Sequence, residues 1–472
     1  MVPMHPRFRL ILHWLPEALL GCLLGYFTLR SLGTFPAAWA DDSLFMIVAK
    51  MVALGRGYVL PIIGYDWPHP FILAVGPTII LPSALAMKLF GLTVAAARIP
   101  MVLYLFIATG CSYLYVRHLA GIFAARWSLA LIVTLSAFVN TGKAVMGEIP
   151  GYAFLILGLL LLRFEKKSLW IAVAIGIAFG LALVTKITYG LLLPVLGLVW
   201  IIAFIRKDWR EFRFLTVALI ALVLTCLIGA YWLGVYTRGF FVEIYWYVLG
   251  GGDGPGIFNI LLKHPVDLLR LPYVHFLLIA FLGFVGWMGL RKRMSITESI
   301  IIFSLVILFA LYFLNGSGWY RHLLPSTLIL FLFVPTGMHR LLPKSAALIA
   351  LLLIILAQGW WQITYRGSND SPEAVEAAKV IVTQYADTSL VVLPAEVFVH
   401  LPDNPHWLFL SAEMELSGRR PAEVEQRMSA ARCLPTVRRV SNEERDQAAS
   451  GFHILFGRYV LFDPPADCPH GA

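Results

Sequence analysis

The feature that most constrains the fold is a series of apolar runs, many of them close to 20 residues long. About 20 apolar residues are enough to cross the hydrocarbon core of a bilayer as a helix. Of the 472 residues, 59% are hydrophobic and 14% are charged, and the mean hydropathy is +0.79. A soluble globular chain is usually about 45–50% apolar with about 25% charged residues. We therefore predict an all-α polytopic membrane protein.

We expect about eleven transmembrane helices. The predicted spans are residues 10–32, 97–116, 126–141, 149–163, 168–184, 188–205, 213–235, 274–290, 297–314, 323–337 and 344–361. One further segment, HPFILAVGPTIILPSALAMKLF at 69–90, is apolar but is interrupted by Gly76-Pro77 and by Pro82.

The short basic loops decide whether 69–90 crosses. The clusters are Arg7/Arg9, Arg117 to Arg126, Arg163 to Lys167, Arg206 to Arg213, Arg291 to Arg293 and Arg340 to Lys344. If 69–90 does not cross, all of these clusters fall on one side, as the positive-inside rule requires. We therefore expect 69–90 to be re-entrant or to lie at the outer interface of the plasma (inner) membrane. The amino end is then cytoplasmic and the carboxyl tail lies outside.

The carboxyl tail differs from the rest of the chain. From Arg366 onward it has 10 Lys and Arg against 15 Asp and Glu, a net −5, while the remainder sums to +15. We predict a transmembrane domain at 1–365, with 33–95 as its first external loop, and a small extracytoplasmic α/β domain at 366–472. SPEAVEAAKVIVTQYA and PAEVEQRMSAAR indicate helices, while SLVVLP, HWLFLS and RYVLF indicate strands. Cys433 and Cys468 lie in this tail and could pair if it is exported, which the sequence leaves open.

The candidate functional residues are the scarce charges at the outer ends of the predicted spans, because an ionisable group at membrane depth is a functional-site hypothesis by default. WADDSLFMIVAKM places two acids before a short interfacial helix that has an apolar face of Leu44, Ile47, Val48 and Met51. The candidates are Asp41, Asp42, Glu148, Lys186, Arg321 and His322.

Several motifs, in order along residues 37–335, resemble those of the GT-C glycosyltransferases. WADDSLFMIVAKMVALGRGYVLP resembles the first external-loop motif, WPHPFILAVGPTIILPSALAMKLFG the re-entrant segment, and AARIP the arginine that follows it. KAVMGEIPGYAF resembles the second acidic motif, LVTKITYG the "TK" motif, and WYRHLLPSTLIL the "RYLLP" motif. In pattern the chain is most similar to protein O-mannosyltransferases, the lipid A aminoarabinose transferase and bacterial lipopolysaccharide transferases.

The resemblance implies an inverting transfer of a sugar from a polyprenyl-phosphate donor to an acceptor hydroxyl at the outer face. The acceptor would be a glycolipid, a polysaccharide or a protein, the other partners would be membrane lipids, and no nucleic acid is implied. Such a reaction needs a carboxylate as general base and cations on the leaving phosphate. Asp41 matches the first acid of the family's pair and is the expected base. Asp42 would cap the helix, orient the acceptor or share a cation.

The remaining roles also follow from the motif positions. Glu148 would hold the acceptor or the sugar, although the family often has Asp-Pro where this chain has Glu148-Ile149-Pro150. Lys186 and Arg321 would clamp the donor phosphate, together with His322. His69 stands where relatives often carry a phosphate-binding lysine. No cofactor follows with certainty, and whether a divalent metal bridges the acids stays open.

Each assignment has a structural alternative. One acid could N-cap a helix that begins near Ser43, Glu148 could simply end a helix in water, and the cations could snorkel to the interface. GGGDGPG at 250–256 is typical of a turn or a lid over the donor site. A transporter or flippase of lipid-linked saccharides is the alternative function, for which internal repeats and broken helices would be expected. A catalytically inactive scaffold is a third.

Overall fold

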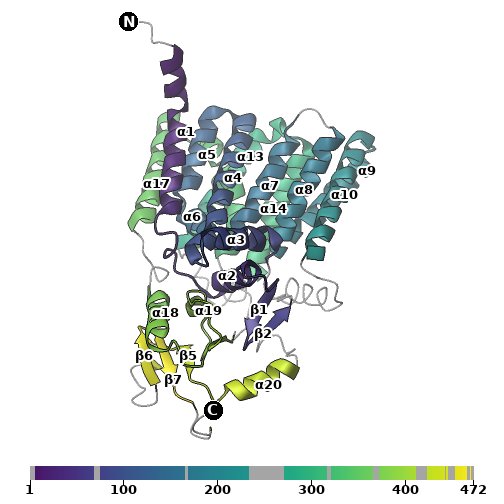
Figure 1. The fold of residues 1–472 in the computed structure, drawn as a ribbon. Helices are drawn as coiled ribbons and strands as arrows, with labels where there is room; N and C mark the ends of the chain where they lie inside the picture. The colour runs from purple at the N-terminus through teal and green to yellow at the C-terminus, as the bar shows by residue number, and fades with distance from the viewer. Residues whose placement is uncertain are drawn as a thin grey trace.

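The computed structural model describes residues 6–68, 75–164, 168–232, 271–315, 320–364, 372–410, 422–441, 443–444, 452–464 and 468. The helices form a bundle, at one end of which lie a layer of short elements and then a sheet domain (Figure 1). The described part of the amino-terminal helix points to the opposite end of the bundle, and the C-terminus lies at the far side of the sheet domain.

The bundle contains a helix for every predicted span. Its elements are α1 (Pro6–Leu29), α4 (Val94–Ala120), α5 (Ile122–Thr134), α6 (Ser136–Lys143), α7 (Glu148–Leu162), α8 (Leu169–Thr185), η1 (Ile187–Leu191), α9 (Leu192–Ile205), α10 (Trp209–Trp232), α13 (Leu271–Leu290), η3 (Arg291–Arg293), α14 (Ile296–Asn315), α15 (Tyr320–Phe331), α16 (Val334–Leu341) and α17 (Lys344–Thr364). Six of the described helices are each long and apolar enough to cross a membrane, or up to eight spans if each of two bent pairs counts as one. The shorter α7 and α8 are also apolar.

Two predicted spans are not straight helices. The span expected at 126–141 is α5 followed by α6, bent by 59°, and the span expected at 323–337 is α15 followed by α16, bent by 57°. The first break falls at Leu135, which is buried and extended. Because no glycine or proline marks Leu135, the sequence gives no local signal for this bend. The first bend leads into α6, which lies near the end of the bundle where the short elements are found (Figure 1).

The short elements lie directly against that end of the bundle. They are α2 (Ala40–Ala53), a hairpin of β1 (Val59–Ile62) with β2 (Tyr65–Pro68), and α3 (Pro77–Phe90). α3 lies across the ends of the bundle helices (Figure 1), as expected for a segment that does not cross. Its Leu85, Leu89 and Phe90 remain exposed, which suits a helix lying at an interface.

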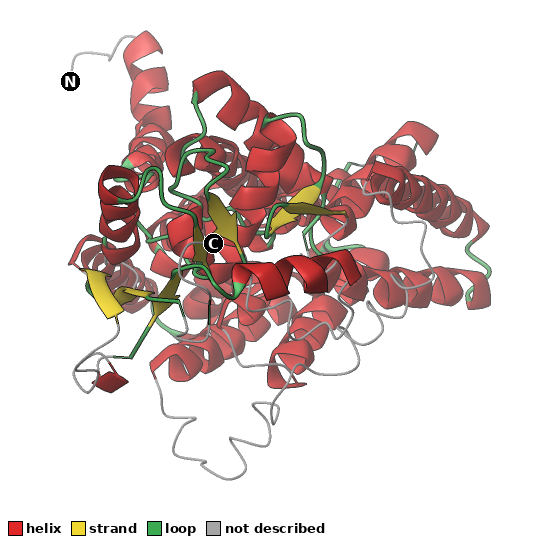
Figure 2. Cartoon of the chain, turned by 60° about the horizontal axis from the view of Figure 1, so that its bottom comes forward, coloured by secondary structure: helices red, strands yellow, loops and turns green. Residues whose placement is uncertain are grey.

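The sheet domain has five strands in the order β4-β3-β5-β7-β6. Its elements are α18 (Glu373–Gln384), β3 (Leu390–Val392), α19 (Ala395–Phe398), β4 (Trp407–Phe409), α20 (Ala422–Ala431), β5 (Thr436–Arg439), β6 (Phe452–Phe456) and β7 (Tyr459–Phe462). β3 pairs in parallel with β4 and β5, while β7 pairs antiparallel with β5 and β6. Figure 2 turns this side toward the viewer and shows the strands in front of the bundle. The expected all-α membrane fold with a small α/β part is confirmed.

The tail contains the helices and strands expected from its motifs, together with α19, β5 and β6, which the sequence did not suggest. Cys433 and Cys468 form a disulfide across 35 positions. The boundary drawn at 365/366 lies outside the described residues, so the division into two domains stays a prediction.

The sheet domain and α2 share one apolar core. Val391, Ala395 and Phe409 of the sheet domain pack in the same cluster as Leu44 and Ile47 of α2. This packing buries α2 from Asp42 to Met51, where the sequence indicated a single apolar face. α2 is buried on more than one face because α3, β1 and α19 of the sheet domain all pack against it.

Candidate functional site

Asp41 meets a cation that comes from the far end of the sequence. Its Oδ2 accepts a hydrogen bond of 2.6 Å from Arg321 Nη2, and the two residues are 280 positions apart. The Arg321 guanidinium also lies over the Trp39 ring, 4.5 Å from the ring centroid. Asp41 stands in the first turn of α2 and Arg321 in the first turn of α15. The ion pair therefore joins the start of α2 to the start of the tenth predicted span.

Glu148 lies beside the same arginine and holds a second cation. Lys186 Nζ donates to Glu148 Oε1 at 2.5 Å, and Arg321 Nε is 3.7 Å from the same oxygen. Glu148 and Lys186 are almost fully buried. The Tyr189 hydroxyl donates to the Glu148 backbone carbonyl. Two carboxylates and two cations thus form one alternating cluster, in which Arg321 touches both acids.

Small residues allow the elements around this cluster to approach closely. A Cβ at Gly147 would lie 2.6 Å from the Lys186 Cβ, so a larger residue there would push Lys186 away from Glu148. A Cβ at Gly76 would lie 1.8 Å from the Val184 carbonyl oxygen. Gly76 N donates to Thr185 O at 3.1 Å, and Val75 forms a β-bridge with Lys186. The start of α3 is thus fastened to the residues that present Lys186.

Asp42 has a different environment from Asp41. Its Oδ2 accepts from Arg98 Nη2 at 2.6 Å, and its Oδ1 accepts from the Val145 backbone N–H at 2.6 Å. Both side chains of the Asp42–Arg98 pair are 0% exposed. Arg98 Nη1 also donates to the carbonyls of Leu32 and Pro36. A buried pair of this kind holds segments together, and here it joins α2, α4 and the segment before α7.

The far end of α2 is fastened to the sheet domain. Lys50 Nζ donates to the Leu401 carbonyl at 2.6 Å, and Ile63 N donates to Phe409 O at 2.7 Å. Burial lowers the pKa of Lys50 to about 8, and nearby Asp403 partly opposes this change. Burial, with the charges of Arg98 and Lys50, lowers the pKa of His400 to about 4, so this histidine is neutral at pH 7. The helix that carries both acids is therefore held at both ends.

Four of the predicted site residues come together: Asp41, Glu148, Lys186 and Arg321. His322 is mostly buried beside Tyr312, with 5.3 Å between the ring centroids. Asp42 is turned toward Arg98 instead. His69 and the sequence GGGDGPG lie outside the described residues.

The capping alternative for the acids is wrong. α2 begins at Ala40 rather than near Ser43, its N-cap is Trp39, and no side chain caps it. Both acids lie inside the first turn, where a negative charge is favourable near the helix N-terminus. Their hydrogen bonds run to Arg321, Arg98 and Val145 instead.

Sequence reasoning did not identify Tyr189, which bonds to Glu148 in the cluster, or the buried Lys143, which lies outside the cluster. Tyr189 lies in the motif LVTKITYG and Lys143 begins the motif KAVMGEIPGYAF, but the motifs gave neither residue a role. Lys143 is 1% exposed at the end of α6. A lysine at the end of an apolar run was the available signal, but snorkelling is the common outcome for such a residue. No group of three or more His, Cys, Asp or Glu side chains suited to a metal ion occurs among the residues that the structure describes.

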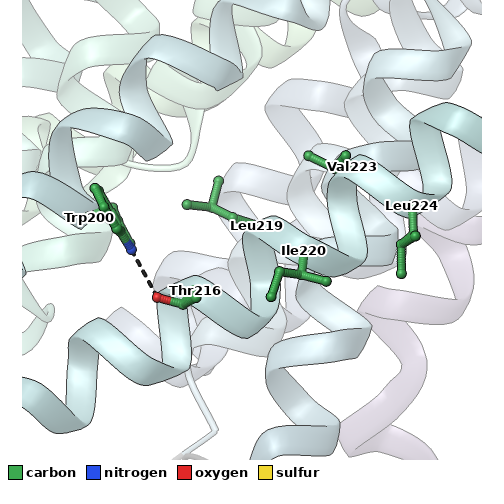
Figure 3. A pocket seen from close by; sticks show the side chains of 6 residues that line it. All are labelled: Trp200, Thr216, Leu219, Ile220, Val223 and Leu224. Carbon is green, nitrogen blue, oxygen red and sulfur yellow. Dashed lines mark hydrogen bonds between the residues drawn. The ribbon is translucent and has the colours of Figure 1, made fainter.

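A separate apolar pocket lies between α9 and α10 and has a volume of about 300 Å³. Trp200, Thr216, Leu219, Ile220, Val223 and Leu224 line it (Figure 3). Trp200 Nε1 donates to Thr216 Oγ1 at 2.9 Å. None of these residues belongs to the charged cluster.

Comparisons with known proteins agree on the fold. Residues 74–232 match the family model described as dolichyl-phosphate-mannose-protein mannosyltransferase. The crystal structure of ArnT from Cupriavidus metallidurans bound to undecaprenyl phosphate is similar, with a TM-score of 0.68 at 14% identity over 96% of this chain and 98% of that chain. The archaeal oligosaccharyltransferase AglB from Archaeoglobus fulgidus, in complex with an inhibitory peptide and a dolichol-phosphate, gives a TM-score of 0.57 at 10% identity, over 91% and 70%.

A search of curated protein sequences found no match. At these identities the structural likeness establishes the fold, and the family model matches the part of the chain that contains Arg98, Glu148 and Lys186. The predicted resemblance is confirmed at the level of the fold: the chain has the fold of these GT-C glycosyltransferase structures, and residues 74–232 match a mannosyltransferase family model.

Proposed function

We propose that this protein is an inverting glycosyltransferase that moves a sugar from a polyprenyl-phosphate donor to an acceptor hydroxyl at the outer face of the inner membrane. The observation that carries the proposal is the cluster in which Arg321 contacts Asp41 while Lys186 contacts Glu148. It supplies in one place a carboxylate for the acceptor and two cations for a phosphate.

Asp41 is the general base in this proposal because it is the acid that an acceptor can reach. Its side chain is 26% exposed, against 3% for Glu148. A general base has to come within hydrogen-bonding distance of the hydroxyl that it deprotonates. Glu148, buried between Lys186 and Arg321, is better suited to holding these two cations in place than to accepting a proton. It contributes to the reaction by orienting them.

Arg321 and Lys186 form the phosphate clamp. They come from the first turn of α15 and from the C-cap of α8. The N-terminus of α15, like that of α7, adds the positive end of a helix dipole, which favours an anion. The buried position of the cations strengthens their attraction to a developing phosphate charge, because solvent screens it less. His322 stands next to them and can donate a hydrogen bond to the phosphate.

The proposed transfer needs only the donor, the acceptor, Asp41 and the two cations. The acceptor oxygen attacks the anomeric carbon from the side opposite the phosphate, and its proton passes to the Asp41 carboxylate. The bond between the anomeric carbon and the phosphate oxygen breaks as the new glycosidic bond forms. The polyprenyl phosphate leaves with the electron pair of the broken bond, and Arg321 and Lys186 neutralise its charge. Attack from the opposite side inverts the anomeric configuration.

The charge pattern and the disulfide support an outer location for the site. The site end of the bundle carries the sheet domain with its Cys433–Cys468 disulfide, and disulfides persist in oxidising compartments. The basic loops lie at the other end of the bundle, and the positive-inside rule assigns the end with basic loops to the cytoplasm. A donor held in the membrane by its polyprenyl chain would then present its phosphate at the outer surface.

The transporter alternative is not favoured. Broken helices are present, as that alternative expects, but Leu135 at the first break and Leu332 and Phe333 at the second belong to the apolar core of the bundle. The charged residues gather instead at the start of α2 and at the helix ends next to it. This position suits chemistry at the membrane surface better than passage through the midplane.

Deletion of the gene, followed by mass spectrometry of envelope glycolipids, polysaccharides and glycoproteins, tests the proposal. We expect one sugar to be missing from one class of acceptor and the sugar-charged polyprenyl phosphate to accumulate. If the lipid that carries the sugar accumulates only on the cytoplasmic side, and the amount of polyprenyl phosphate without sugar does not change, the protein would be a flippase. An unchanged glycan profile would contradict the transferase function.

A further inference from the structure

The strongest unexplained feature outside the proposed site is the buried side-chain amino group of Lys143. The side chain is 1% exposed. Its Nζ donates to the Arg30 carbonyl at 2.7 Å and to the Phe27 carbonyl at 3.5 Å, and it lies 5.2 Å from the centroid of the Phe35 ring. These contacts, among the residues that the structure describes, are with neutral groups rather than with a carboxylate. A buried amino group in such surroundings depends on these few hydrogen bonds, because burying a polar group without partners is costly.

The contacts of Lys143 have a common location. α1 ends at Leu29, so Phe27 and Arg30 present carbonyls at its C-terminal end, where the last carbonyls lack helical partners and the dipole favours a cation. Phe35 belongs to the connection that runs from there to Trp39 and Asp41. Lys143 therefore holds the origin of the connection that carries the proposed base.

The segment that follows Lys143 contacts the site at two further points. Two residues later the Val145 N–H donates to Asp42, and five residues later Glu148 enters the charged cluster. The segment from 143 to 148 thus joins the end of α1, the second acid of α2 and the acid beside Lys186. A displacement of this segment would move Asp41 and Glu148 relative to each other.

We propose that Lys143 is a positioning residue of the transfer reaction, which fixes the connection between α1 and α2 so that Asp41 meets Arg321 beside Glu148. The inference rests on the function proposed above. Within the described part of the chain, Lys143 Nζ bonds to the carbonyls of Phe27 and Arg30 and lies over the Phe35 ring, rather than contacting the charged cluster. Its effect is therefore on the geometry of the acids rather than on the chemistry itself.

The test compares Lys143→Met with Lys143→Arg in the purified full-length protein. Met keeps an unbranched chain of similar length without the charge, and Arg keeps a donor for the carbonyls. Lys88→Met is the matched control, because Lys88 is an exposed lysine at the end of α3. We expect Lys143→Met to lower kcat at least tenfold while KM for the polyprenyl-phosphate sugar changes less than twofold. Lys143→Arg should recover most of kcat, and Lys88→Met should behave like the unmodified protein.

Hydrogen–deuterium exchange separates positioning from simple stability and does not depend on activity. In Lys143→Met we expect amides of residues 30–39 to exchange at least fivefold faster, while amides in the middle of α8 and α10 keep their rates. A general loss of stability would instead accelerate exchange throughout. Unchanged exchange at 30–39, or a kcat equal to that of Lys88→Met, would overturn the inference. If no donor or acceptor supports activity in the unmodified protein, the proposed function fails, but the exchange result still decides whether Lys143 holds the connection.

Discussion

Arg321 stacks on Trp39 with its guanidinium 4.5 Å from the ring centroid while it donates to Asp41, two residues further along the chain. A guanidinium is planar, so it can stack on an aromatic ring and donate directional hydrogen bonds in its own plane at the same time. The ammonium group of a lysine is not planar and cannot stack in this way. This arrangement fixes the orientation of the arginine relative to α2. It explains why an aromatic residue precedes the acid pair in WADD.

Replacing Arg321 by Lys should therefore impair the reaction even though the charge is kept. We expect kcat to fall about 10-fold in Arg321→Lys and about 10²–10³-fold in Arg321→Ala, the range found when one stabilising group is removed from a developing charge. Binding of polyprenyl phosphate, measured by titration with the purified protein, should weaken in the same order. Equal donor affinity in all three proteins would exclude Arg321 from the phosphate site.

Asp42 should matter for stability rather than for chemistry. Removing one partner of a buried ion pair leaves an uncompensated charge and costs about 3–5 kcal/mol, so Asp42→Leu should lower the unfolding temperature and the yield strongly. The double variant Asp42→Leu, Arg98→Met removes both charges and should recover much of the loss. The exposed pair of Arg56 with Asp66 is the control, because Asp66→Ala should cost only about 0–1 kcal/mol. Thermal unfolding in detergent measures all of these variants.

A folded Asp42→Leu protein of normal stability would contradict this division of roles. The division of roles would also be contradicted if the double variant were no more stable than Asp42→Leu alone. Contacts of Arg98 other than its ion pair with Asp42 would then contribute more to stability. In either case Asp42 would not have the structural role proposed here, and a catalytic role shared with Asp41 would have to be considered.

Lys50 should make stability depend on alkaline pH. Its pKa falls from 10.5 in the unfolded chain to about 8 in the folded protein because of burial. Between these values the unfolded chain binds a proton that the folded protein does not, so stability rises as the pH increases from about 8 to about 10.5. The gain is roughly 3 kcal/mol if the whole change is realised. Below pH 8 the full penalty for burying the charge is present.

The measurement is the unfolding temperature of the protein and of Lys50→Met at several pH values between 7 and 10. Only the difference between the two proteins is informative, because other groups titrate in both. The unmodified protein should gain stability relative to Lys50→Met as the pH rises. Parallel curves would mean that Lys50 keeps its ordinary pKa.

The Cys433–Cys468 disulfide should stabilise the tail. A bridge that closes a loop of this length contributes about 3–4 kcal/mol in the chain-entropy account. Cys433→Ser should therefore make the sheet domain more sensitive to protease and abolish the effect of reducing agent. Cys111→Ser, which removes a free cysteine, should leave both unchanged. Equal protease sensitivity of Cys433→Ser and the unmodified protein would show that the bridge contributes nothing.

The sequence predicted the spans and the members of the charged cluster because these depend on local signals. A span requires a run of apolar residues whatever its neighbours are, and Asp41, Glu148, Lys186 and Arg321 each stand at the end of such a run. The ion pairs between them could be expected from topology, since they all belong to one end of the bundle.

Other features depend on long-range packing and left no local pattern. The burial of α2 on both faces needs the sheet domain, which is more than 300 positions further along the chain, as the contact between Lys50 and Leu401 across 351 positions illustrates. The bend at Leu135 lacks a glycine or proline to mark it. The hairpin of β1 and β2 was hidden because its strands lie within a stretch that reads as apolar loop. Asp42 and Asp41 look equivalent in sequence, and only Arg98 and Val145 distinguish them.

The most direct test of the account is complementation of the deletion strain with Asp41→Asn, followed by mass spectrometry of the acceptor that lacks its sugar. Asn keeps the size of the side chain but cannot take the acceptor proton. The account predicts that the unmodified gene and Lys88→Met restore the sugar, whereas Asp41→Asn does not, at equal abundance in the membrane. Full restoration of the sugar by Asp41→Asn would contradict it.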